Sequence, residues 1–142
     1  GGLSSNPKAI KEEELNDRCD GNYIQWLGYR SDVPDLLRSS HIIAFPSYYR
    51  EGVPKSLIEA TAIGRPIVTT NSIGCKDTVE DGVNGFLIPI KDSKALAEKL
   101  RILIDDADLR KRMGLNSRQI AERDFSLDDV IAKHLAIYEL MY

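Results

Sequence analysis

Two glutamates, Glu51 and Glu59, are separated by seven residues, and the sequence predicts that a helix begins between them. Pro54 suits the first helical position, because the N–H that proline lacks would have no partner there. Glu59 then lies about two turns into a stretch of apolar and small residues, 57–63. A carboxylate in such surroundings is costly to bury without a polar partner. We therefore expect Glu59 to meet a ligand or a neighbouring side chain.

The start of this helix is itself a predicted anion site. The backbone N–H groups of Gly52, Val53, Lys55 and Ser56 would converge there with the positive end of the helix dipole, which suits a diphosphate. Glycine at the first of these positions allows close approach of a ligand. Glu59 would lie roughly 7 Å along the axis from the helix start, with the other glutamate on the far side. Carboxylates pair well with hydroxyl donors, so this arrangement fits a nucleoside-diphosphate sugar.

Short apolar segments alternate with helical ones over the first 90 residues, which predicts an α/β fold with a Rossmann-like parallel sheet flanked by helices. In such sheets ligands bind beyond the carboxyl ends of the strands. The last third is predicted to be all helical, with a capping-box pattern at Ser126. The expected strands are Tyr23–Leu27, His41–Phe45, Ile67–Thr70 and Phe86–Ile88, and the expected helices are Lys8–Arg18, one capped by Ser31 or Asp32, Pro54–Ile63, Lys76–Glu80, one capped by Asp92 or Ser93, Asp106–Asp124 and one after Ser126.

The composition favours a single domain over residues 1–142, and the net charge of −3 gives no basic excess that would indicate nucleic-acid binding. No apolar run is long enough to cross a bilayer. Cys19 and Cys75 lack metal-ligand or disulfide-framework spacing, which favours a cytoplasmic protein. The chain opens on loop-like residues, so we expect it to begin partway into a larger protein.

Glu51 and Glu59 match the E-x7-E motif of the retaining GT4-type glycosyltransferases (glycosyl transferases group 1), and the chain resembles this family over nearly its whole length. These enzymes have the GT-B fold of two facing Rossmann-like domains. Further segments that resemble the family are Gly28-Tyr29-Arg30 with Asp32-Val33-Pro34, Phe45-Pro46-Ser47, Gly64-Arg65-Pro66-Ile67-Val68, Asp81-Gly82-Val83-Asn84-Gly85-Phe86-Leu87-Ile88-Pro89 and Phe125-Ser126.

The resemblance implies a donor-binding, C-terminal domain that is truncated at its N-terminus. It implies that Glu51 contacts the transferred sugar near the reacting centre and is the catalytic candidate. It also implies that Glu59 binds the ribose hydroxyls, and that Tyr29 and Arg30 lie near the nucleobase. Gly52-Val53-Pro54 departs from the Gly-Phe-Gly that often follows the first glutamate, which leaves the sugar contacts open.

The reaction that the resemblance implies is transfer of a hexosyl group, with retention, from a nucleoside-diphosphate sugar to a glycan or lipid-linked acceptor in polysaccharide biosynthesis. The acceptor would be held by the absent N-terminal domain. No metal and no cofactor are expected, and the chain alone is expected to be inactive. The whole enzyme is expected in the cytoplasm, with peripheral association at the inner face of the membrane as a further option.

Several alternatives stay open at this point. Glu59 can instead form an i, i+4 ion pair with Lys55, although lysine before glutamate is the weaker order. Arg30, Arg50 and Arg65 can be solvated loop charges, and Arg110-Lys111-Arg112 a solvated helix face. The segment 81–85 is interpreted as turn chemistry and not as a phosphate cradle. The alternative functions are a non-catalytic nucleotide-binding or scaffold domain and a GT-B sugar-nucleotide epimerase.

Overall fold

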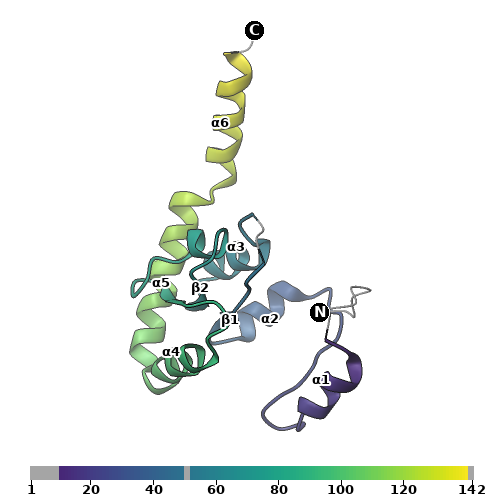
Figure 1. The fold of residues 1–142 in the computed structure, drawn as a ribbon. Helices are drawn as coiled ribbons and strands as arrows, with labels where there is room; N and C mark the ends of the chain where they lie inside the picture. Colours follow the sequence, from purple (N-terminus) through teal and green to yellow (C-terminus); the bar gives the residue numbers. More distant parts are fainter. Residues whose placement is uncertain (1–9, 50–51, 141–142) are drawn as a thin grey trace. The chain divides into compact units, whose positions relative to one another are not determined.

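The computed structural model describes residues 10–49 and 52–140, and its ribbon is shown in Figure 1. The chain divides into two compact units, one ending at Asp35 and the other beginning at Leu36.

The first unit contains one helix that lies wholly within it, α1 (Glu12–Arg18), which buries none of its residues. The strand predicted over Tyr23–Leu27 is wrong, because these residues adopt no regular structure. The Asp20 carboxylate accepts hydrogen bonds from the backbone N–H groups of Asn22, Tyr23 and Ile24, at 2.9, 2.7 and 3.0 Å. Amides held in this way cannot enter a strand ladder, and they keep the pKa of the Asp20 carboxyl below its usual value, the bond from Ile24 most of all.

The second unit is built on a parallel three-stranded sheet in the order β1 (Ile43–Phe45), β2 (Ile67–Thr70) and β3 (Gly85–Ile88). Ile43, Ile67 and Gly85 stand side by side at the edge where the three strands begin. All four residues of β2 are buried, as expected for a central strand that is covered on both faces. The predicted parallel α/β fold is confirmed.

The helices follow the predicted order, with small shifts at their ends. Asp92 and Asp106 cap two helices, accepting hydrogen bonds from the backbone N–H groups of Ala95 and Leu109 at 2.9 and 2.7 Å. Ser126 is an N-cap, but its side chain makes no cap hydrogen bond. The helices are α2 (Val33–Ser39), α3 (Lys55–Ala62), the 3₁₀-helix η1 (Cys75–Thr78), α4 (Ser93–Asp105), α5 (Ala107–Asp124) and α6 (Leu127–Glu139).

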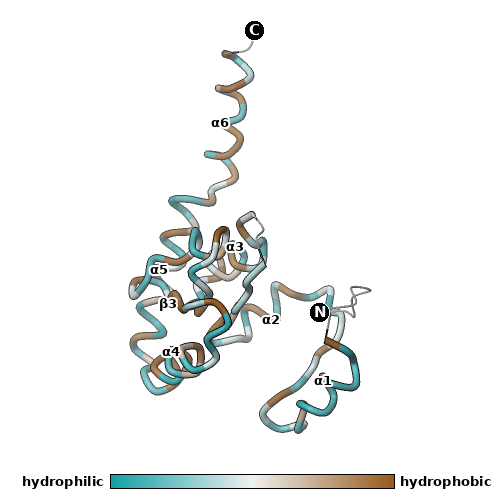
Figure 2. Tube along the Cα trace, in the orientation of Figure 1, coloured by the Kyte–Doolittle hydropathy of each residue, from teal (hydrophilic) through white to brown (hydrophobic). Residues whose placement is uncertain are grey.

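Alternate residues of the central strand supply two apolar cores, one on each face of the sheet. Ile67 packs in a cluster with residues of α2, α3 and η1, among them Leu37, Leu57 and Ala60. Val68, the next residue, packs on the other face in a cluster with residues of α4 and α5. The period of two along the strand therefore assigns α2, α3 and η1 to one face, and α4 and α5 to the other. The hydropathy colouring in Figure 2 shows apolar residues at β3 and an alternation of apolar and polar residues along α6.

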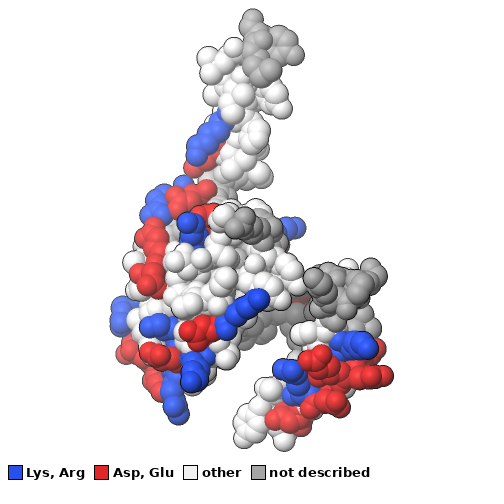
Figure 3. All heavy atoms as spheres, viewed as in Figure 1, with Lys and Arg blue, Asp and Glu red and all other residues white. Residues whose placement is uncertain are grey.

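Every residue of α6 is exposed, including its apolar ones. Most of the α6 surface in view in Figure 3 carries no charged side chain, whereas both signs of charge are mixed over the face below it. Within residues 10–49 and 52–140, none of the helices combines the length and the apolar character that a membrane crossing requires.

Candidate functional site

The three strands end at one edge of the sheet, which we call the carboxyl edge. Two buried threonines at the end of β2 hold the loop that follows β1. Thr69 donates its hydroxyl to the carbonyl of Phe45 at 2.7 Å, and Thr70 donates to the carbonyl of Ser47. The sequence analysis did not single out these threonines, although a Thr-Thr pair at the end of a buried strand offers hydroxyls to the neighbouring loop. They fix the start of the segment that leads to α3.

Tyr48, Tyr49 and Lys91 form an exposed cluster over the same edge. The two tyrosine rings stack with their centroids 4.8 Å apart, and the Nζ of Lys91 lies 4.9 Å from the centroid of the Tyr48 ring. Contact with the Tyr48 side chain raises the pKa of Tyr49 above its usual value. A hollow of about 220 Å³ adjoins this cluster and is lined by Tyr48, Thr70, Lys91 and residues at the start of α4. The sheet edge thus presents an aromatic and cationic surface beside the predicted site.

The amino end of α3 has the features of an anion site. Pro54 is buried and lies at the N-cap, with φ −63° and ψ 125°, rather than at the predicted first helical position. Its carbonyl accepts the N–H groups of Leu57 and Ile58 at 3.0 and 3.2 Å. The first N–H groups of a helix have no intrahelical partner, so those of Lys55 and Ser56 remain for an external acceptor. Proline has no side-chain oxygen to cap them, which leaves this end open to an anion.

Glu59 is partly buried, with 32% of its side chain exposed, and its Oε1 lies 3.7 Å from the Nζ of Lys55. The ion pair that the sequence left open as an alternative is therefore present. The lysine side chain is 89% exposed, so this pair is weak and screened by solvent. Lys55 and Glu59 lie one turn apart on a stripe of α3 that starts at its open amino end. The arrangement leaves carboxylate oxygens of Glu59 available to a hydroxyl donor.

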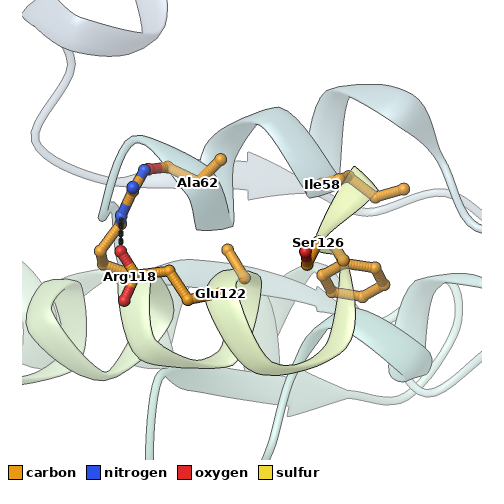
Figure 4. Close-up of a pocket in the computed structure, with 7 residues that line it drawn as sticks. Ile58, Ala62, Arg118, Glu122 and Ser126 are labelled. Atoms are coloured by element: carbon orange, nitrogen blue, oxygen red, sulfur yellow. Dashed lines mark hydrogen bonds and ion pairs between the residues drawn. The ribbon is translucent and has the colours of Figure 1, made fainter. Parts of the chain in front are cut away.

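Another face of α3 looks onto α5, as Figure 4 shows. Ile58 and Ala62 line a hollow of about 280 Å³ together with residues of α5 and the start of α6. Arg118 crosses it, donating to the carbonyl of Ala62 at 2.7 Å and pairing with Glu122 at 2.7 Å. Glu59 does not line this hollow. The helix therefore uses separate faces for packing on α5 and for its carboxylate.

Three predicted site residues are not tested by the structure. Glu51 lies outside the described residues. Tyr29 and Arg30 belong to the first unit, which is described separately, so their place near a nucleobase stays a prediction. Tyr29 is exposed, and the Nε of Arg30 donates to the carboxylate of Asp32 at 2.7 Å, which holds the pKa of that carboxyl below its usual value. Gly52 and Val53 are exposed at the loop end, next to α3.

Two basic residues that the sequence suggested as solvated charges have structural partners. The Nε of Arg65 donates to the carbonyl of Leu37 at 3.2 Å at the end of α2. Arg110 donates to the carbonyls of Leu103 and Ile104 at 2.5 and 2.7 Å at the end of α4. Each guanidinium thus donates to carbonyls at the carboxyl end of a helix.

The segment 81–85 forms a turn, as predicted. Asn84 is fully buried, donating to the carbonyl of Thr78 at 3.0 Å and accepting from the N–H of Glu80 at 2.8 Å. Asp81 accepts the N–H of Leu87 at 2.8 Å. Asn84 and Asp81 thus use side-chain polar atoms to hold the turn that leads into β3.

Across residues 10–49 and 52–140, no three His, Cys, Asp or Glu side chains gather closely enough to hold a metal ion. Cys19 and Cys75 are both free thiols. The expectation that no metal and no cofactor take part stays a prediction.

The fold and the open helix end at the carboxyl edge are those of a glycosyltransferase domain of the GT-B class. A glycosyltransferase from Rickettsia africae superposes with a TM-score of 0.82 at 29% identity, over 89% of this chain and 34% of that one. The HepE protein of Anabaena, solved in complex with UDP-glucose, superposes with a TM-score of 0.76 at 28% identity, over 87% of this chain and 35% of that one.

The chain belongs to the family described as glycosyl transferases group 1, whose model matches residues 7–120. It is 33% identical, over 95% of its length, to the N,N'-diacetylbacillosaminyl-diphospho-undecaprenol alpha-1,3-N-acetylgalactosaminyltransferase of Campylobacter jejuni. It is 41% identical, over 68% of its length, to the capsular polysaccharide biosynthesis glycosyltransferase CapM of Staphylococcus aureus. The chain spans 37% and 25% of the lengths of these two relatives.

Proposed function

We propose that this chain is the donor-binding part of a retaining, GT4-type glycosyltransferase that transfers a hexosyl group from a nucleoside-diphosphate sugar. The single observation that carries the proposal is the amino end of α3. Its N–H groups at Lys55 and Ser56 have no intrahelical partner, and a partly buried carboxylate, Glu59, lies one turn further on.

In this proposal the diphosphate accepts hydrogen bonds from the backbone of Gly52, Val53, Lys55 and Ser56. Charge that develops on the leaving diphosphate is then stabilised by fixed amide dipoles, which need no reorganisation during the reaction. The ammonium group of Lys55 adds a positive charge at the same end. We assign no metal and no cofactor to this step.

Glu59 then accepts hydrogen bonds from the ribose hydroxyls, and Glu51 contacts the transferred sugar. Binding of the ribose draws Glu59 away from its weak pair with Lys55 and gives each oxygen of the carboxylate a hydroxyl donor. The freed lysine is then available to the diphosphate. Tyr29 and Arg30 are assigned to the nucleobase side.

The acceptor is assigned to a glycan or a lipid-linked glycan, held by a part of the enzyme outside this chain. The relative from Campylobacter jejuni is named for an undecaprenol-diphosphate acceptor, which supports this assignment. We therefore assign the whole enzyme to the inner face of the membrane, by peripheral association. The 142-residue chain alone is expected to have no transferase activity, because the acceptor half is not part of it.

The experiment is a thermodynamic cycle measured by calorimetry on the chain. UDP, GDP and ADP are tested first, and the diphosphate that binds best is compared with its 2′-deoxy form, for the native chain and for Glu59→Ala. If Glu59 accepts a hydrogen bond from the ribose 2′-hydroxyl, either Glu59→Ala or removal of that hydroxyl alone weakens binding about tenfold. Once one of the two changes has been made, the other should weaken binding little further.

Glu98→Ala is the matched control, since Glu98 is an exposed glutamate of α4 on the other side of the sheet. It should leave nucleotide affinity unchanged. Fully additive effects of Glu59→Ala and of the missing hydroxyl would refute the ribose contact. Indifference of the chain to all three nucleotides would refute the donor site.

A further inference from the structure

The opposite edge of the sheet, where the strands begin, carries a hollow of about 450 Å³ lined by basic side chains. We call this the amino edge. Neither Asp nor Glu occurs among the described residues that line the hollow. Its polar lining consists of His41, Arg65, Arg110, Lys111 and Arg118. A smaller hollow of about 220 Å³, lined by His41, Ile42, Ile104 and Arg110, continues from it.

Three of these side chains are partly neutralised by their neighbours. Arg65, Arg110 and Arg118 each donate to carbonyls at the end of a helix, namely α2, α4 and α3. The carboxyl end of a helix carries roughly half a negative charge, so each guanidinium keeps part of its positive charge. Arg118 also pairs with Glu122 at 2.7 Å, which neutralises it further.

Lys111 differs from the arginines, because within the described chain its side chain has neither an ion pair nor a hydrogen bond. It lies on α5 beside Arg110 and brings a whole positive charge to the lining. The charge of Lys111 and the charge on Arg65 and Arg110 that the helix ends do not neutralise add up to about two positive charges in the hollow. Such a concentration of one sign repels itself unless an anion enters.

The lining also keeps hydrogen-bond donors in fixed directions. A guanidinium has five N–H donors, and Arg65 and Arg110 use only some of theirs on the helix carbonyls. These bonds anchor the two side chains, so little side-chain entropy is lost when an anion binds. Anchored guanidinium groups and an unpaired ammonium group match a tetrahedral oxyanion that accepts several hydrogen bonds.

We propose that this basic hollow binds a phosphate group, carried either by a soluble phosphate compound or by a lipid headgroup. It lies at the amino edge of the sheet, whereas α3 opens at the carboxyl edge, so the two sites are distinct and the proposal does not depend on nucleotide binding. The exposed apolar side chains of Ile104 and Leu115 border the same surface.

The test is an NMR titration of the 15N-labelled chain with sodium pyrophosphate, followed at the amides of Gly64, Gly114 and Leu115, which line the hollow. In parallel, the chain is sedimented with phosphatidylcholine vesicles that contain or lack phosphatidylglycerol. Saturable shifts with pyrophosphate identify a soluble phosphate compound. Sedimentation that requires phosphatidylglycerol, without such shifts, identifies a lipid headgroup, and both outcomes support the site.

The decisive variant is Lys111→Gln, which removes a charge from an exposed residue without a partner and should leave the fold intact by circular dichroism. Arg112→Gln is its matched control, since Arg112 is the next residue of α5, is exposed and does not line the hollow. We expect the first variant to weaken binding roughly three- to tenfold and the second to leave it nearly unchanged. Absence of binding in both arms, or equal weakening by the two variants, would overturn the proposal.

Discussion

The two edges of the sheet are built in opposite ways. At the amino edge, where the strands begin, backbone segments touch and buried polar groups are paired. At the carboxyl edge, the loop before α3 is exposed at Gly52 and Val53, and the first N–H groups of α3 point to no helical partner. The backbone of the first edge is closely packed, whereas the second edge has free backbone N–H groups where α/β sheets bind their ligands.

The close contacts of the amino edge involve two pairs of residues. An added Cβ at Gly85 would lie 1.9 Å from the carbonyl oxygen of Ile67 on the neighbouring strand. An added Cβ at Gly114 would lie 2.5 Å from the carbonyl oxygen of Gly64, whose φ of +76° itself favours glycine. At the carboxyl edge an added Cβ at Gly52 would meet nothing within 4 Å.

The largest expected effect is that of Gly85→Ala. The new methyl group would collide with the backbone at the start of β2, which can move only by separating β2 from β3, so we expect a loss of about 3 kcal/mol in the free energy of unfolding. Urea denaturation measures it. Gly52→Ala is the matched substitution at the other edge and should change stability by less than about 0.5 kcal/mol. Similar losses of stability for Gly85→Ala and Gly52→Ala would show that the backbone is packed equally closely at the two edges.

Asn84→Ala is expected to cost about 2–3 kcal/mol. Asn84 is fully buried, and its amide group bridges the carbonyl of Thr78 and the N–H of Glu80. The substitution leaves both of these backbone groups without their partner. Asn116→Ala removes a comparable hydrogen bond, to the carbonyl of Val83, in an exposed setting. Thermal unfolding should therefore show a clearly smaller loss for Asn116→Ala, and equal losses would contradict the assignment.

Gly114→Ala sets two effects against each other. Helix propensity alone predicts that alanine inside α5 stabilises the protein by about 1 kcal/mol. The contact with Gly64 predicts the reverse, because the obstacle is a backbone carbonyl and not a flexible side chain. We expect the contact to prevail, with a net loss of about 1–2 kcal/mol by urea denaturation. A net gain would show that α5 and the turn after α3 separate easily.

The smallest effect is expected at the exposed end of α5. Arg123 pairs with Glu80 at 2.6 Å and with Asp124, and its hydrogen bond to Asp124 lowers the pKa of that carboxyl. A carboxyl with a lowered pKa in the folded state adds stability above its unfolded pKa and loses it as the pH falls. Arg123→Gln should therefore slightly reduce the stability that is lost as the pH falls below about 4. Parallel pH profiles for both proteins would contradict this.

The sequence predicted the elements whose signals are local. The short segment Ile67–Thr70 after Pro66 predicted β2, and Asp92 predicted the start of α4 through a side-chain cap that the structure contains. The sequence also placed the start of α5 near Asp106, but the cap that the Asp106 side chain forms there was not predicted. The strand predicted at Tyr23–Leu27 failed because Asp20, just outside it, captures three of the backbone amides. An apolar pattern does not reveal such competition from a neighbouring side chain.

Of the candidate site, the part on helix α3 could be predicted from the sequence. The open amino end of α3 and the two readings of Glu59 followed from spacing and residue type, and the structure contains the weak pair with Lys55. The partners of Arg65 and Arg110 could not be predicted, because each arginine reaches the end of a different helix. The contact of Gly114 with Gly64 likewise depends on how two helices pack, which spacing along one helix does not encode.

The most direct test of the central claim is an NMR titration of the 15N-labelled chain with UDP, followed residue by residue at both edges of the sheet. We predict that the amides of Lys55 and Ser56 shift at the lowest nucleotide concentrations, and that those of Asn84 and Gly85 do not move. Early shifts confined to the amino edge, with Lys55 and Ser56 unchanged at saturation, would contradict it.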